Sequence, residues 1–140
     1  MLCIGNKARG DDGVARRVAE LLEGCFGAEV TLVSQPQLDV VLAEDVAAAD
    51  EVIFIDAERR AAPLVAVTDV VPDASGSNAH ALDPSGLLAL SQALYACAAA
   101  ARLVSVAAPE MGHAEGLSAI AEAASHEAAS EVLRMIGAQP

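Results

Sequence analysis

The sequence has little lysine and few aromatic residues. Lys7 is the only lysine among 140 residues, aromatic residues make up 2% of the chain, and tryptophan is absent. Because the formal net charge is −12, the chain lacks the positive surface that nucleic-acid binding requires. We therefore expect no nucleic-acid partner, and the acidic surface suits a basic partner or a cation.

Long apolar runs and paired cysteines are also missing. No run approaches the roughly 20 apolar residues of a membrane span, and Met1–Ile4 lacks the basic flank of a signal peptide. Cys3, Cys25 and Cys97 are odd in number and widely spaced, which is typical of free, mostly buried thiols. We predict a cytoplasmic protein that is a monomer and has no membrane partner.

Hydrophobic residues, by contrast, are abundant. They make up 54% of the chain, and many of them are alanine. A chain of this length buries enough surface to fold without disulfides or metals. We expect a single domain over residues 1–140, with an aliphatic core of closely packed small side chains.

Strand and helix patterns alternate along the chain. Strand patterns occur at Met1–Gly5, Glu29–Ser34, Glu51–Asp56, Leu64–Val71 and Arg102–Ala108. Helical patterns occur at Asp12–Glu23, Gln37–Ala48, Pro84–Ala100 and Ser118–Ile136. This alternation predicts an α/β sandwich around a mostly parallel sheet.

Three of the helical patterns predict apolar faces that turn toward the core. The inward residues of the first are Val14, Val18, Leu21 and Leu22, those of the third are Leu87, Leu90, Leu94 and Cys97, and those of the last are Ile120, Ala124, Ala128, Val132 and Met135. Asp83 followed by Pro84 is a strong start signal for the third helix, and Gly137 is a stop signal for the last.

Chemically active residues follow the predicted strands. Asp12 follows the first strand, Asp56 ends the third, and His80 lies in the loop after the fourth. Because ligands of open α/β sheets bind beyond the carboxyl ends of the strands, we expect these three side chains to meet. Carboxylates with a neutral imidazole suit nickel, zinc, iron or manganese, and the same trio suits acid–base chemistry.

Several of these residues also have simpler interpretations. Asp12 fits the N-cap or first turn of the following helix, and His80 fits a surface turn. His126 and the Arg59–Arg60 pair fit solvated faces, although an arginine pair also suits an acidic peptide. Cys3, inside a strand, fits packing better than nucleophilic attack.

The first loop resembles a phosphate-binding loop in its glycine spacing but not in its charge. Gly5 and Gly10 are spaced as in that loop, whereas Asp11 and Asp12 replace the lysine and hydroxyl that hold phosphate and magnesium. A phospho-receiver domain is disfavoured because the segment 107–109 lacks its lysine. The dinucleotide-binding pattern is absent, and nothing local supports a serine triad.

Five segments, in order, resemble one family, the hydrogenase maturation endopeptidases. The segments are GNKARGDDGVA (5–15), IFIDA (53–57), NAHALDPSGLLAL (78–90), SVAAPE (105–110) and EGLS (115–118). The resemblance implies a three-layer, phosphorylase/hydrolase-like sandwich whose twisted, mostly parallel five-stranded sheet has helices on both faces. It also implies an aspartic-type peptidase that removes the C-terminal extension of a nickel–iron hydrogenase large-subunit precursor after nickel insertion.

The resemblance assigns catalytic and metal-contacting roles to Asp12, Asp56 and His80, the trio that topology also groups. Nickel would then be held by the substrate precursor, and Asp11 would be a capping or supporting group. Ala8 and Ala15 depart from the family pattern, which has a larger apolar residue and often a glycine there. A non-catalytic metal- or partner-binding module of the same fold, acting in hydrogenase assembly, is the alternative function.

Overall fold

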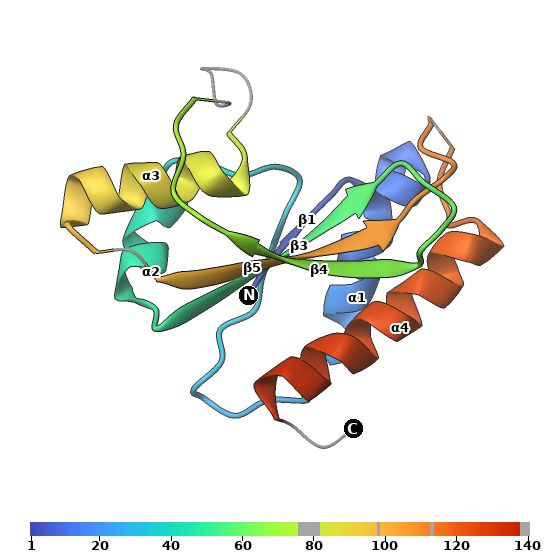
Figure 1. The fold of residues 1–140 in the computed structure, drawn as a ribbon. Helices are drawn as coiled ribbons and strands as arrows, with labels where there is room; N and C mark the ends of the chain where they lie inside the picture. The colour runs from blue at the N-terminus through green and yellow to red at the C-terminus, as the bar shows by residue number, and fades with distance from the viewer. Residues whose placement is uncertain (76–81, 98, 113, 138–140) are drawn as a thin grey trace.

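The computed structural model describes residues 1–75, 82–97, 99–112 and 114–137 (Figure 1). The strands are β1 (Leu2–Ile4), β2 (Val33–Gln35), β3 (Glu51–Glu58), β4 (Val65–Val70) and β5 (Ala100–Ala107). The helices are α1 (Val14–Leu22), α2 (Leu42–Ala48), α3 (Pro84–Tyr95) and α4 (Ala119–Ile136). Two short 3₁₀ turns, η1 (Lys7–Arg9) and η2 (Asp11–Gly13), fill the loop between β1 and α1.

The five strands form one sheet in the order β2-β1-β3-β5-β4. All neighbours pair in parallel except β4, which runs antiparallel to β5 at the edge. The prediction of a mostly parallel five-stranded sheet is therefore confirmed. The four parallel strands β1, β2, β3 and β5 have their carboxyl ends at the same end of the sheet. The outermost strand, β4, has its carboxyl end at the opposite end.

Helices cover both faces of this sheet, as predicted. Alternate residues of β3 enter two separate apolar clusters: Ile53 and Ile55 pack with α1 and α4, whereas Val52 and Phe54 pack with α2 and α3. All four side chains are buried, which explains the nearly continuous apolar run in this strand. Figure 1 shows α1 and α4 on one side of the sheet and α2 and α3 on the other.

The long helix α4 depends on small residues for its packing. Ala124, Ala128 and Val132 are fully buried and face α1 and β5, as the stripe predicted. The expected end signal at Gly137 is confirmed, because this residue adopts the left-handed conformation with φ of 78°. Ile120, in contrast, was predicted to face inward and is 39% exposed.

The end of α3 differs from the prediction. Its start at Asp83 and Pro84 is confirmed, but the helix ends at Tyr95 instead of continuing to Ala100. Ala100 pairs with Glu51 at the start of β5, so strand pairing overrides the helix propensity of the alanine run. The predicted inward positions of Leu94 and Cys97 are consequently wrong, since both side chains are exposed.

β2 and α2 both begin later in the sequence than predicted. β2 covers Val33–Gln35 instead of Glu29–Ser34, because the three residues of β1 offer only three pairing positions. α2 begins at Leu42 instead of Gln37, because the Asp39 side chain accepts a hydrogen bond from the Val41 amide and forms a turn there.

The cysteines are free, as predicted, but only Cys3 is buried. Burial raises the pKa of the Cys3 thiol to about 12, which suits a packing role and not a nucleophile. Cys25 and Cys97 are exposed, so the prediction of mostly buried thiols is wrong for both. None of the helices in the described part of the chain is long and apolar enough to cross a membrane.

Candidate functional site

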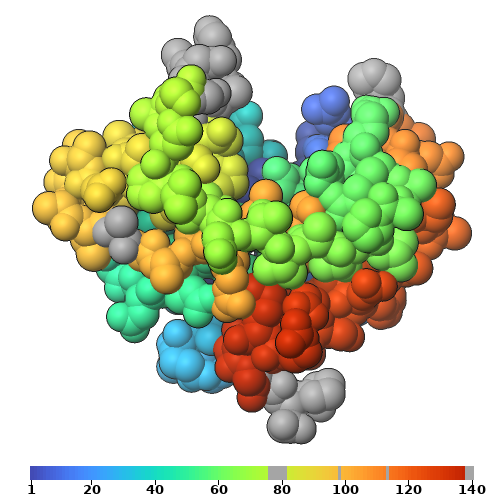
Figure 2. Space-filling model, viewed as in Figure 1, coloured from blue at the N-terminus to red at the C-terminus, as the bar shows by residue number. Residues whose placement is uncertain are grey.

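Asp12 and Asp56 lie at the edge of the sheet where β1 and β3 end. The register pairs Ile4, the last residue of β1, with Asp56, so the first loop leaves the sheet directly beside this carboxylate. Figure 2 shows the molecular surface hollowed at the top of the view, between the blue first loop with the green segment after β3 and the yellow-green start of α3. The side chains of Asp12 and Asp56 are both partly exposed, so neither is closed off from solvent.

Asp12 is held by the backbone of the first loop. Its carboxylate accepts a hydrogen bond from the Asn6 amide at 3.1 Å. Its carbonyl oxygen lies so close to Gly5 that a Cβ on Gly5 would come within 2.0 Å of it. The N-cap of α1 is Gly13, and no side chain of the described residues caps the helix there. Asp12 is therefore not the helix cap that its position in the sequence also allowed.

Asp56 lies within β3, two residues before the end of the strand, and is half-buried. Burial raises its pKa from the usual 3.8 to about 6. The negative charges of Asp12 and Glu58 raise this pKa further, whereas a hydrogen bond from the Ala57 amide, at 2.8 Å, opposes the rise. The effect of the Asp12 charge on Asp56 agrees with the strand register, which places the first loop beside Asp56.

The third predicted residue, His80, lies outside the described residues. Its expected position came from a loop that follows a parallel strand, but β4 is antiparallel. Val70, the last residue of β4, pairs with Ala101 near the start of β5, whereas Asp56 pairs with Ser105 near its end. The chain therefore leaves β4 at the end of the sheet opposite to Asp56. Within the described ranges, no group of three histidine, cysteine, aspartate or glutamate residues is arranged to hold a metal ion. The placement of His80 beside the two carboxylates stays a prediction.

Asp11 has a different environment from its neighbour. It is fully buried, and its carboxylate accepts hydrogen bonds from the Glu110 amide, the Ser118 amide and the Ser118 hydroxyl. With both oxygens occupied, Asp11 has little capacity left for a ligand. These contacts agree with the predicted supporting role of Asp11.

Arg60 is a residue beside the site that the sequence did not indicate. It was expected to be solvated, but its side chain is only 16% exposed. Its guanidinium donates to the Ser105 hydroxyl and carbonyl at 2.9 and 3.0 Å, and it pairs with Glu58. Ser105 is the register partner of Asp56 on β5, so Arg60 fastens the segment after β3 next to the carboxylate. Only the close spacing of Glu58 and Arg60 in the sequence hinted at this pair.

A cavity of about 510 Å³ lies at the other end of the sheet. Its lining includes Met1, Thr31, Asp50 and Val52, near the amino ends of β1 and β3. It contains neither Asp12 nor Asp56. The cavity is therefore separate from the two carboxylates.

The two carboxylates can do two things chemically. Carboxylate oxygens bind divalent cations, including one that a partner protein presents. A carboxylate with a pKa of about 6 is mostly ionised at neutral pH and is still basic enough to accept a proton from water. Both properties require access from solvent, and the side chains of Asp12 and Asp56 are both partly exposed.

The fold belongs to the class of α/β sandwiches. Solved structures of several hydrogenase maturation proteases have the same fold, and the similarity covers nearly the whole chain. The hydrogenase 2 maturation peptidase from Thaumarchaeota archaeon SCGC_AB-539-E09 is 22% identical, with a TM-score of 0.72 over 99% of this chain and 97% of that one. The maturating endopeptidase HybD from E. coli is 22% identical, with a TM-score of 0.69 over 99% and 93%. The NiFe hydrogenase maturation protease HycI from Thermococcus kodakarensis KOD1 is 19% identical, with a TM-score of 0.73 over 97% and 90%.

These likenesses, all below 25% identity, establish the fold. None of the protein-family models matches the sequence, and no curated protein sequence matches it significantly. The chain therefore has the fold of solved hydrogenase maturation proteases, which agrees with the fold that the sequence resemblance implied.

Proposed function

We propose that the chain is a member of the hydrogenase maturation endopeptidases. Its function would be to remove the C-terminal extension of a nickel–iron hydrogenase large-subunit precursor after nickel has been inserted. The observation that carries this proposal is the pairing of Asp12 and Asp56 at the carboxyl edge of a sheet with this fold. The sequence segments around both residues, GNKARGDDGVA and IFIDA, resemble that family independently of the fold.

In this proposal the substrate brings the metal. Nickel in the precursor is the anchor that Asp12 and Asp56 contact, with His80 as the predicted third ligand. Anchoring places the scissile peptide bond beside the carboxylates, and this proximity accounts for much of the rate. A precursor without nickel lacks the anchor, so cleavage reports that the metal is in place.

The carboxylates also supply the proton chemistry. Asp56, whose pKa is raised to about 6, is the proposed proton acceptor at neutral pH. It would take a proton from the attacking water and pass it to the leaving amine. Direct attack by a carboxylate on the scissile carbonyl is the other route, and trapping of a covalent intermediate distinguishes it.

Cleavage of a defined precursor tests this function. The purified protein is incubated with a nickel-loaded large-subunit precursor and with the same precursor lacking nickel, and the released C-terminal peptide is followed by mass spectrometry. We expect release only from the nickel-loaded form. Stable binding of this form without release would contradict the peptidase and support the non-catalytic binding module.

Single substitutions then test the trio. Asp12→Asn, Asp56→Asn and His80→Ala should each abolish release while the circular dichroism spectrum stays that of the folded protein. Asp45→Asn is the matched control, because Asp45 lines the cavity at the opposite end of the sheet. Full activity of His80→Ala would remove this residue from the proposed site without affecting the two carboxylates.

A further inference from the structure

Asp11 is a buried acidic residue that the proposed chemistry does not use. Its three hydrogen bonds, from Glu110 N at 2.8 Å and from Ser118 N and Oγ at 2.7 Å each, join three segments, the first of which is 99 and 107 positions from the bonded residues of the other two. These are the first loop, the loop after β5 and the start of α4. A carboxylate that accepts several hydrogen bonds from backbone amides makes strong, directional contacts.

The backbone around Asp11 is packed just as closely. The Asp11 amide donates to the Glu110 carbonyl, and the Gly112 amide donates to the Arg9 carbonyl, both at 3.1 Å. Gly10 has φ of 61°, and a Cβ there would lie 2.6 Å from the Glu110 carbonyl oxygen. The first loop and the loop after β5 therefore touch along their main chains, and Gly10 leaves no room there for a side chain.

This contact continues directly to Asp12. Asp11 and Asp12 belong to the same 3₁₀ turn, η2, so a shift of one moves the other. On the opposite side of the turn, the Asn6 amide bonds the Asp12 carboxylate and Gly5 fits beneath the Asp12 carbonyl. The turn is thus held from two sides, by Asp11 toward α4 and by residues 5 and 6 toward β1.

We propose that Asp11 is a positioning residue, which fixes the Asp12 carboxylate relative to Asp56 by fastening η2 to Glu110 and Ser118. This inference rests on the proposed function for its catalytic consequence but not for its structural one. Loss of the Asp11 contacts would displace Asp12 without removing it. If Asp11 only stabilised the whole fold, in contrast, its loss would destabilise the first loop no more than the rest of the protein.

Asp11→Asn is the direct test, because an amide has the same shape but only one acceptor oxygen. Whichever way the amide turns, its NH₂ group faces either the Glu110 amide or the Ser118 amide, so one buried backbone N–H loses its partner. The first measurement is hydrogen exchange of individual amides by NMR. We expect protection of the Asn6 amide to fall at least about tenfold further than that of Phe54 in the core of β3.

Equal losses of protection at Asn6 and Phe54 would overturn the proposal, since they would indicate global destabilisation alone. So would unchanged protection at Asn6. Asp39→Asn is the matched control: Asp39 also accepts a backbone hydrogen bond, from Val41, but is exposed where Asp11 is buried. It should leave protection at Asn6 unchanged.

The second measurement is cleavage of the nickel-loaded precursor. We expect Asp11→Asn to lower kcat at least about tenfold with KM within about threefold of the wild type, as for a misplaced catalytic group. A change in KM alone would overturn the positioning role. If the wild type does not cleave the precursor, the proposed function fails, whereas the exchange measurement still decides the role of Asp11.

Ser118 provides a second route if Asp11→Asn does not fold. Ser118→Ala removes one hydrogen bond to Asp11, and Ser118→Thr restores the hydroxyl. We expect the alanine variant to lose protection at Asn6 and the threonine variant to regain it. Since Ser118 also caps α4 through the Ala121 amide, equal protection at Asn6 in both variants would contradict the proposal.

Discussion

Asp11 and Asp56 are two acidic residues near the same end of the sheet. Their carboxylates differ strongly in the hydrogen bonds they accept and in the charges nearby. Asp11 is fully buried and accepts three hydrogen bonds. Asp56 is half-buried, accepts one from Ala57, and faces the charges of Asp12 and Glu58. Hydrogen bonds engage both carboxylate oxygens of Asp11, whereas burial and nearby charges raise the pKa of Asp56, as is common where a protein keeps a reactive group.

The substitution Asp56→Asn should have the largest effect on cleavage. We expect cleavage of the precursor to fall at least about 100-fold, because the amide cannot accept a proton. The same variant should raise the free energy of unfolding at pH 7 by about 1–3 kcal/mol, because it removes a poorly satisfied charge. Mass spectrometry and urea denaturation measure the two effects. A less stable variant would show that the surroundings of Asp56 favour its charge after all.

Asp11→Asn should have the opposite effect on stability. We expect the free energy of unfolding to fall by about 2–4 kcal/mol. The backbone N–H of either Glu110 or Ser118 loses its acceptor, and a charge-assisted hydrogen bond is lost. Urea denaturation at pH 7 measures this change beside Asp39→Asn, which should stay within about 0.5 kcal/mol of the wild type. Equal changes for Asp11→Asn and Asp56→Asn would remove the distinction between the two carboxylates.

Gly5→Ala tests how tightly the first loop holds Asp12. The new Cβ would lie 2.0 Å from the Asp12 carbonyl oxygen, so the backbone must move. We expect a loss of about 3 kcal/mol in the free energy of unfolding, together with a loss of cleavage. Gly112→Ala, where a Cβ would meet nothing within 4 Å, is the matched control. Similar stabilities of the two variants would mean that the loop adjusts freely.

The pH dependence of stability gives a smaller effect with a defined sign. The folded-state pKa of Asp56 is about 6, above the usual 3.8, so the native state holds this proton more tightly than the unfolded state. The stabilisation is complete below pH 3.8 and is lost as the pH rises to about 6. Relative to Asp56→Asn, the wild type should therefore lose about 2 kcal/mol between pH 4 and pH 7. A constant difference in stability over this range would contradict the raised pKa.

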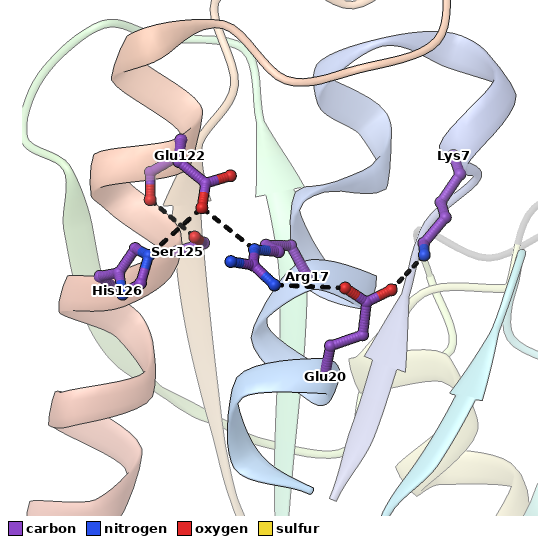
Figure 3. A network of polar contacts seen from close by, with 6 residues as sticks. All are labelled: Lys7, Arg17, Glu20, Glu122, Ser125 and His126. Atoms are coloured by element: carbon purple, nitrogen blue, oxygen red, sulfur yellow. Dashed lines mark hydrogen bonds and ion pairs between the residues drawn. The ribbon is translucent and has the colours of Figure 1, made fainter.

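The smallest effect concerns the polar network in Figure 3, which links the first loop, α1 and α4 through Lys7, Glu20, Arg17 and Glu122. Its members are largely exposed, so water and salt screen their charges. We expect Arg17→Ala to lower Tm by less than about 4 °C, and less still in 1 M salt. A larger, salt-independent drop in Tm would mean that Arg17 packs between the helices instead of only pairing across them.

The sequence predicted the layers of the fold well because apolar periodicity records burial. The run around Phe54 is buried on both faces, and Ala124 and Ala128 lie in the core as their stripe indicated. Strand direction is not recorded in this way, because an edge strand has the same local pattern whether it is parallel or antiparallel. The reversal of β4 was therefore not predicted, and the expectation for His80 depended on it.

Long-range polar contacts were also beyond the local pattern. The position of Asp56 beside the first loop was predictable because β1 and β3 are parallel neighbours. The contact between Arg60 and Ser105 was not predicted, because it depends on the register of β3 and β5. The prediction that α3 continues through the alanine run after Tyr95 was wrong for a related reason. The pairing of Ala100 with Glu51 outweighs the helix propensity of the run.

The contact between Asp11 and Ser118 spans 107 positions of the sequence. A ribosome makes the first loop early and Ser118 only after all five strands. Contacts between such distant residues form late, because the intervening chain must first be ordered. A growing chain therefore carries both carboxylates of the site long before the loop beside them is fastened, and the last helix completes the site.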